Sequence, residues 1–204
     1  FAVMDIKTRK LLKLIPLPTA TGAWAITVAT DGKVWVGSYR DGHVYCYDPK
    51  SEKLTDLGRS PADSDVLFGL TAGPDGSVFG GSYGRAKIFG YTKTGQPISI
   101  DSVSPSDSYS HDTSYDSQNK KLYVGIGSSK AKVFRLNLDE QNRPNLTNAK
   151  QILPEKYQTQ SEAYDLNYIA GKLFVKLHPA FETIVLDLKT DMIDAMTDRT
   201  TNQK

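Results

Sequence analysis

The chain has 204 residues, of which 39% are hydrophobic, and this is enough to build one sizeable core. Its 25 Lys and Arg nearly balance its 23 Asp and Glu and like charges do not cluster, so we expect no nucleic-acid partner. No apolar stretch approaches the ~20 residues of a membrane span, and the first residues lack the basic and apolar regions of a secretory signal. The single cysteine, Cys46, excludes a disulfide framework and a thiolate metal cluster, so we expect a packed structural thiol.

Residues 1–17 predict two strands joined by a polar turn. The first strand covers 1–6 and the second covers 11–17. Their pattern matches the last two strands of the unit that follows them, so the first two strands of their own unit are missing. Because the chain opens inside a unit, with Phe1 rather than Met, we expect it to be a fragment of a longer protein.

The stretch 25–57 predicts four short strands in a row. β-branched and aromatic runs of this kind, separated by Asp-Gly turns, are typical of antiparallel hairpins. The turns are centred on Asp31-Gly32 and Asp41-Gly42. The predicted strands cover 25–28, 34–39, 43–47 and 54–57.

This unit recurs along the chain. Its second strand begins at Val34, Val78, Leu122 and Leu173, which gives spacings of 44, 44 and 51 residues. A four-stranded unit that recurs at about 40 to 50 residues is typical of β-propeller blades. A β-sandwich also has regularly spaced short strands, but four copies with the same order of turns and strands favour the propeller.

We therefore predict an all-β chain, a β-propeller with four-stranded antiparallel blades of which about four and a half are present. The ring would be an incomplete part of a larger propeller, possibly of seven blades, and its exposed flank would pair with the missing blades or with another chain. The alternative is a closed five-bladed ring with a degenerate closing strand. The predicted parts of this one propeller domain are the outer strands of an incomplete blade at 1–17, blades at 22–60, 66–103, 110–153 and 161–196, and a polar tail at 197–204.

A candidate site follows from this geometry. In a propeller the innermost strand of each blade begins on one face, and the loop between the second and third strands returns to that face. Aligned strand entrances and loops should therefore converge around the central channel. The entrances carry Trp24, Phe68, His111 and Tyr164, and the loops carry Tyr39, Arg40, Tyr83, Arg85, Lys130 and His178.

Aromatic rings and basic side chains on one rim suit an extended anionic sugar chain. His111 is the candidate general base, and Tyr164 is a candidate acid or base beside it. Asp112 should point elsewhere because side chains alternate along a strand. Asp112 and Asp116 could hold a metal with His111, but no ligand spacing supports this, and we expect neither a metal nor a cofactor.

A structural interpretation of the same residues stays open. Aromatic rings at strand entrances often serve as packing plugs, and a histidine in a polar Ser-Tyr-Ser-His-Asp-Thr context is often a satisfied hydrogen-bonding group. Arg40 and Arg85 could be solvated hairpin tips. The functional interpretation depends on all of these residues meeting on one face.

The repeats resemble known families. The stretch 70–79, Leu-Thr-Ala-Gly-Pro-Asp-Gly-Ser-Val-Phe, is similar to the repeat of streptogramin-lyase-like and NHL/SMP-30-like propellers. The stretch 36–49 looks like blades of bacterial secreted propellers in large cell-surface proteins. Some propellers of this general kind are polysaccharide lyases, which cleave uronic-acid glycans by β-elimination with His and Tyr while Arg or Lys neutralises the carboxylate. His111 and Tyr164 are candidates for those roles by position.

The leading hypothesis is a carbohydrate-directed propeller of a bacterial secreted or surface protein, hence extracellular, and a candidate polysaccharide lyase on acidic glycans. In that case His111 removes the proton next to the uronate carboxylate, while Arg40 and Arg85 stabilise the developing enolate. The competing hypothesis is a non-catalytic module that uses the same rim to bind a ligand or a protein. Whether the chain is an enzyme stays open at this point.

Overall fold

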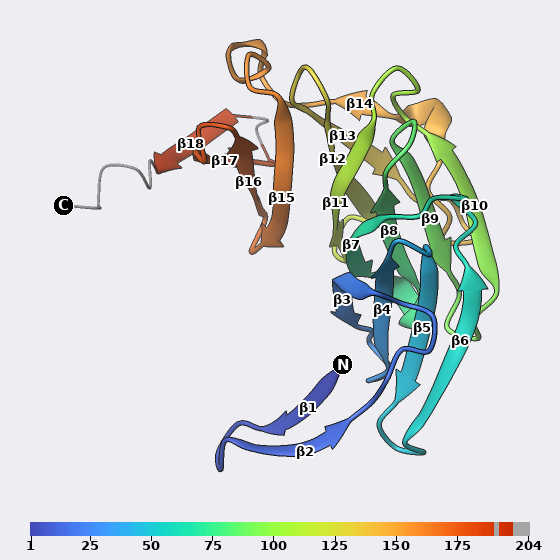
Figure 1. Ribbon diagram of the computed structural model, residues 1–204. Coiled ribbons are helices and arrows are strands. Elements are labelled where there is room, and N and C mark those ends of the chain that lie inside the picture. Colours follow the sequence, from blue (N-terminus) through green and yellow to red (C-terminus); the bar gives the residue numbers. More distant parts are fainter. Residues whose placement is uncertain (190–191, 198–204) are drawn as a thin grey trace.

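Antiparallel sheets that fan around an open arc make up the computed structural model, which describes residues 1–189 and 192–197. Four sheets have four strands each, and a fifth has two (Figure 1). A single residue pair, Gly127 with Glu162, joins the last two four-stranded sheets at one edge. The chain is therefore a partial β-propeller with four blades and half of a fifth, as predicted.

The strand bounds place each blade. The half blade consists of β1 (Ala2–Asp5) and β2 (Lys10–Leu14). The first and second full blades are β3 (Gly22–Val28), β4 (Val34–Tyr39), β5 (His43–Asp48) and β6 (Lys53–Arg59), then β7 (Leu67–Ala72), β8 (Val78–Ser82), β9 (Lys87–Tyr91) and β10 (Pro97–Ser102). The third and fourth are β11 (Tyr109–Asp116), β12 (Lys121–Gly127), β13 (Lys132–Asn137) and β14 (Lys150–Gln151), then β15 (Glu162–Ile169), β16 (Lys172–His178), β17 (Thr183–Asp187) and β18 (Met192–Thr197).

Helical structure among the described residues is confined to three short turns, η1 (Pro74–Gly76), η2 (Leu146–Asn148) and η3 (Glu155–Tyr157). None of them is long and apolar enough to cross a bilayer. Of the predicted polar tail, Thr197 is the last residue of β18, and the remainder lies outside the described residues.

The core lies between neighbouring blades. Trp35 and Val44 of the first full blade pack with Leu67 and Phe89 of the second, and equivalent clusters join the second blade to the third and the third to the fourth. Cys46 is half-buried at the edge of the first of these clusters, and burial raises the pKa of its thiol to about 11. A thiol in that state is protonated at neutral pH, which fits a packing role.

Glycines let the blades approach each other closely. A Cβ at Gly81 in β8 would overlap the backbone oxygen of Ser110 in β11, and a Cβ at Gly125 in β12 would overlap that of Ala163 in β15. The second strand of one blade therefore lies directly against the innermost strand of the next. This contact sets the distance between neighbouring inner strands, which line the concave side of the arc (Figure 1).

The flank of the arc at the half blade is apolar and uncovered. Ile26 and Val28 of β3 are each 60% exposed, and Leu12 and Leu14 of β2 are exposed as well. A hollow of about 700 Å³ lies between the chain at Phe1, Leu14 to Leu17 and the face of β3. The described residues thus form an open arc and not the closed five-bladed ring considered as the alternative.

Candidate functional site

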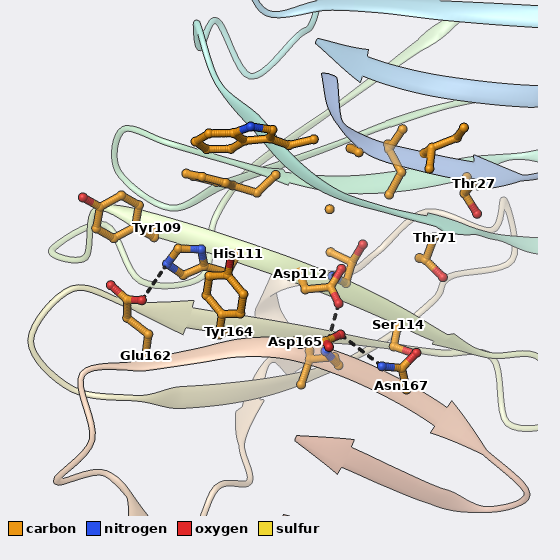
Figure 2. A pocket seen from close by; sticks show the side chains of 18 of the residues that line it. Thr27, Thr71, Tyr109, His111, Asp112, Ser114, Glu162, Tyr164, Asp165 and Asn167 are labelled. Carbon is orange, nitrogen blue, oxygen red and sulfur yellow. Dashed lines mark hydrogen bonds and ion pairs between the residues drawn. The ribbon is translucent and has the colours of Figure 1, made fainter. Parts of the chain in front are cut away.

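A groove of about 1020 Å³ runs along the innermost strands of all four full blades. β3, β7, β11 and β15 each contribute side chains to its wall, so the groove coincides with the concave side of the arc (Figures 1 and 2). The fold therefore converts four sequence-distant strands into one continuous surface.

Every inner strand carries a β-bulge at the same place. The register of β3 shifts between Ala23 and Ala25, and that of β11 shifts between Ser110 and Asp112. The same shift occurs in β7 and in β15. A bulge leaves an extra residue outside the regular pairing and redirects its side chain. The extra residues are Trp24, Phe68 with Gly69, His111 and Tyr164.

These bulges line up four rings across the groove. The ring centroids of Trp24 and Phe68 are 5.4 Å apart and nearly parallel, at 26°. Phe68 lies 4.8 Å from His111, and His111 lies 5.2 Å from Tyr164. At the outer end Tyr39 stacks on Trp24 at 4.4 Å. We call the set Tyr39, Trp24, Phe68, His111 and Tyr164 the ring ladder; the structure brings these five predicted residues together.

Further rings extend the ladder on both sides. Tyr109 stacks on His111 at 4.9 Å and contacts Tyr83 at 5.3 Å. His178 lies 6.3 Å from Tyr164 and 5.0 Å from Phe181. The predicted residues Tyr83 and His178 therefore adjoin the ladder, although neither lines the groove itself.

His111 is held in an unusual electrostatic position. It is 8% exposed, and its Nε2 lies 3.3 Å from Glu162 Oε2 without making a hydrogen bond. His178 Nδ1 approaches the same oxygen at 3.7 Å. Burial lowers the pKa of His111 even though the Glu162 carboxylate favours the charged form. The imidazole is therefore neutral at neutral pH and can accept a proton.

The expectation for Asp112 is wrong. Regular alternation would turn it away from His111, but the bulge at His111 breaks the alternation, so both residues line the groove (Figure 2). Asp112 Oδ2 accepts a hydrogen bond from the Leu166 N–H at 2.9 Å, and Oδ1 accepts one from the Thr113 N–H at 2.8 Å. Burial outweighs these donors and raises the pKa of Asp112 to about 7, with Asp165 adding to the rise.

Sequence reasoning missed two carboxylates. Asp165 follows the bulge residue of β15 just as Asp112 follows that of β11, and its Oδ1 accepts a hydrogen bond from Asn167 Nδ2 at 3.0 Å. Glu162 lies two residues before Tyr164 on the same strand and reaches the groove beside His111 (Figure 2). Both carboxylates could have been predicted from the sequence, because each lies within two residues of Tyr164, the aligned strand entrance of the fourth blade.

Beyond the aspartates the groove wall is polar and uncharged. Figure 2 shows the rings at one end, the aspartates in the middle and hydroxyl or amide side chains at the other end. The last group consists of Thr27, Thr71, Ser114 and Asn167, one from each inner strand.

The predicted basic residues do not enter the groove. Arg40 lies over the Tyr39 ring, with Cζ 5.3 Å from its centroid, and is exposed. Arg85 and Lys130 are exposed turn residues. Among the described residues no Lys or Arg lines the groove, whereas three carboxylates do. The expectation of a cationic binding surface is therefore not met, because these side chains lie at the tips of hairpins and are exposed to solvent.

The metal hypothesis for His111, Asp112 and Asp116 fails on geometry. The Asp116 carboxylate is buried and accepts hydrogen bonds from the backbone of Gln118 and from Asn119, which fixes the turn after β11. Within 1–189 and 192–197 no three His, Cys, Asp or Glu side chains converge in a way that could hold a metal ion.

Comparisons with known proteins define the fold class. No protein-family model matches the chain, and no curated protein matches it either. Among solved structures, a catalytically inactive virginiamycin B lyase from Staphylococcus aureus with quinupristin is similar at 19% identity, over 95% of this chain and 61% of that one, with a TM-score of 0.68.

Other solved structures agree with this class. A streptogramin B lyase matches at 15% identity over 97% of this chain and 61% of its own, with a TM-score of 0.73. A chain of a nidogen/laminin complex matches at 10% identity, over 98% of this chain and 72% of its own, with a TM-score of 0.72. The chain therefore has a β-propeller fold like that of the streptogramin B lyases and spans about 61% of their length. At these identities the likeness shows the fold alone.

Proposed function

We propose that the groove binds a carbohydrate chain. The observation that carries this proposal is the ring ladder, because aromatic faces stack on the apolar faces of sugar rings and leave the sugar hydroxyls free for polar partners. Trp24 is 56% exposed and Tyr164 is 48% exposed, so part of each ring is accessible to a ligand. The hydroxyl and amide groups at the far end of the groove can hydrogen-bond the same chain.

The resemblance of the repeats to bacterial surface propellers extends this proposal to location. We place the protein outside the cell or at the cell surface of a bacterium, where polysaccharides are accessible.

The environment of His111 favours a second candidate function, a polysaccharide lyase on uronate glycans. The neutral imidazole would take the proton from the carbon next to the uronate carboxylate. The electron pair of the broken C–H bond would form the new C=C bond. The glycosidic oxygen would then leave with the proton of the Tyr164 hydroxyl. No Lys or Arg among the described residues lines the groove, and Arg40 lies over Tyr39, beyond Trp24 and Phe68 from His111. This candidate therefore lacks a cation beside His111 to stabilise the developing enolate, which makes it the second candidate.

Binding to a panel of neutral, amino-sugar and uronate oligosaccharides, measured by calorimetry, tests the main proposal. Trp24→Ala should weaken binding about fivefold, since a lost aromatic stack costs about 1 kcal/mol. Ile169→Ala is the matched control, because Ile169 is 58% exposed but lies outside the groove. Equal effects of the two variants, or no binding to any member of the panel, would contradict a carbohydrate groove.

A further arm of the same experiment separates the lyase from a non-catalytic module. Uronate glycans are incubated with the protein, and ultraviolet absorbance of an unsaturated product is followed. Product that disappears in His111→Ala supports the lyase. Binding without product supports a scaffold that binds its ligand and does not change it.

A further inference from the structure

Charge is distributed unevenly along the groove. The wall formed by β3 and β7 is uncharged and mainly aromatic or apolar, and it includes Trp24 and Phe68. The wall formed by β11 and β15 carries the carboxylates of Asp112, Glu162 and Asp165. No cationic Lys or Arg balances them among the described lining residues. A ligand in this groove therefore contacts ring faces on one side and carboxylates on the other.

We propose that the ligand carries a positively charged amine, so that the glycan in the groove is an amino-sugar chain with free amino groups. The inference rests on the proposed carbohydrate-binding function and names the substrate class within it. Ring faces and carboxylates attract the same group, because an ammonium is drawn to the negative face of an aromatic ring and donates hydrogen bonds to carboxylate oxygens.

The polar atoms around Glu162 point to a missing donor. His111 Nε2 is buried and His178 Nδ1 is inaccessible, and neither makes a hydrogen bond, although both lie within 4 Å of Glu162 Oε2. A buried polar atom without a partner costs free energy that a ligand can recover. An ammonium carries three N–H donors and can donate one of them to the Glu162 carboxylate.

The aspartates offer a second contact for a chain of amino sugars. Both oxygens of Asp112 already accept backbone hydrogen bonds, from Leu166 and Thr113. Asp165 Oδ1 accepts a hydrogen bond from the side chain of Asn167. Asp165 is therefore the better partner for a second ammonium, because burial raises the pKa of the neighbouring Asp112 to about 7 and favours its neutral form.

The same arrangement disfavours a carboxylated sugar in this part of the groove. A uronate beside Glu162 and Asp165 would place like charges together where water is partly excluded, which is unfavourable. The cationic Arg40 reaches only the outer end of the ladder, over Tyr39. The charges thus select for amines along β11 and β15.

Two oligosaccharides that differ only in the amine provide the test. The probes are a chitosan hexamer, with free amino groups, and its fully N-acetylated counterpart, the chitin hexamer. Calorimetric titration of the unmodified protein at pH 5.5, where the amino groups of the sugar are protonated, and at low salt should show the chitosan hexamer binding at least tenfold more tightly. This comparison needs no variant, so a folding defect cannot affect it.

Variants then locate the contact. Glu162→Gln and Asp165→Asn should each reduce the chitosan preference about tenfold and change binding of the chitin hexamer less than twofold. Asp101→Asn, at an exposed aspartate outside the groove, should leave the preference unchanged. A preference that survives both groove variants would overturn the assigned contact.

The outcomes distinguish the two proposals. Equal or tighter binding of the chitin hexamer overturns the amine inference and leaves the carbohydrate groove standing. Failure of both hexamers to bind, together with no binding to neutral or uronate oligosaccharides, overturns the carbohydrate proposal itself.

Discussion

His111 and Asp112 are neighbours in sequence with opposite electrostatic behaviour. Burial lowers the pKa of the imidazole and raises the pKa of the carboxyl, so both groups are driven toward their neutral forms. The same desolvation acts on both because the bulge turns both side chains into the groove. Two titratable groups with shifted pKa values therefore lie side by side in one groove.

Asp112 makes stability depend on pH in a defined direction. Its pKa of about 7 in the folded chain exceeds the ordinary aspartate value of 3.8, so the folded state binds more protons than the unfolded state between about pH 4 and pH 7. The free energy of unfolding should therefore fall as pH rises through this window. Asp112→Asn should flatten the fall, as measured by urea unfolding at pH 4.5, 6 and 7.5.

The control for this measurement is Asp101→Asn, because Asp101 is exposed and far from the groove wall. It should keep the slope of the unmodified chain. If Asp112→Asn and the unmodified chain have the same dependence on pH, the raised pKa of Asp112 is refuted.

At the scale of elements, the inner strands show which features of the fold can be predicted from the sequence. Asp-Gly turns and β-branched runs indicate the strands, and the alignment of repeats predicts that Trp24, Phe68, His111 and Tyr164 occupy equivalent positions. The bulges escaped prediction because they arise where one blade packs against the next. Gly69 illustrates this, since a Cβ there would overlap Asp112 of the neighbouring inner strand.

Two errors about charge follow from the bulges and from hairpin geometry. A strict alternation pattern hides Asp112, because one extra residue shifts every later side chain to the other face. Arg40 and Arg85 share the correct face by sequence order but end in exposed turns with positive φ, at 76° and 64°. The order of residues predicts the face of the propeller on which a turn lies. It does not predict the direction of a long charged side chain at the tip of that turn, because such a side chain extends to where its charge is hydrated.

Close packing between blades gives a test at the same scale. A Cβ at Gly81 would overlap Ser110 of the next inner strand, so Gly81→Ala should destabilise the fold by about 1 to 3 kcal/mol. Gly22→Ala is the matched control, because nothing lies within 4 Å of a Cβ at that position. Urea unfolding compares the two. A Gly81→Ala variant as stable as Gly22→Ala would contradict the close approach of β8 and β11.

At the scale of the whole molecule, the arc joins the groove and the open flank. The inner strands line the concave side of the arc (Figure 1) and form the groove. At one end of the arc, β3 and the half blade leave apolar side chains uncovered. Chains of similar fold extend further, since this chain spans about 61% of the streptogramin B lyases. An open sheet flank of this kind can pair with further blades or with another chain.

The central claim is that the arc brings one inner-strand ring from each of the four full blades into the ring ladder. Proton–proton nuclear Overhauser effects between aromatic rings, recorded on a deuterated chain with protonated aromatic and histidine side chains, test it most directly. The account predicts cross-peaks that link Trp24 to Phe68, Phe68 to His111, and His111 to Tyr164 in sequence. Assigned ring signals that show cross-peaks only within their own blades would contradict the ladder and the groove built on it.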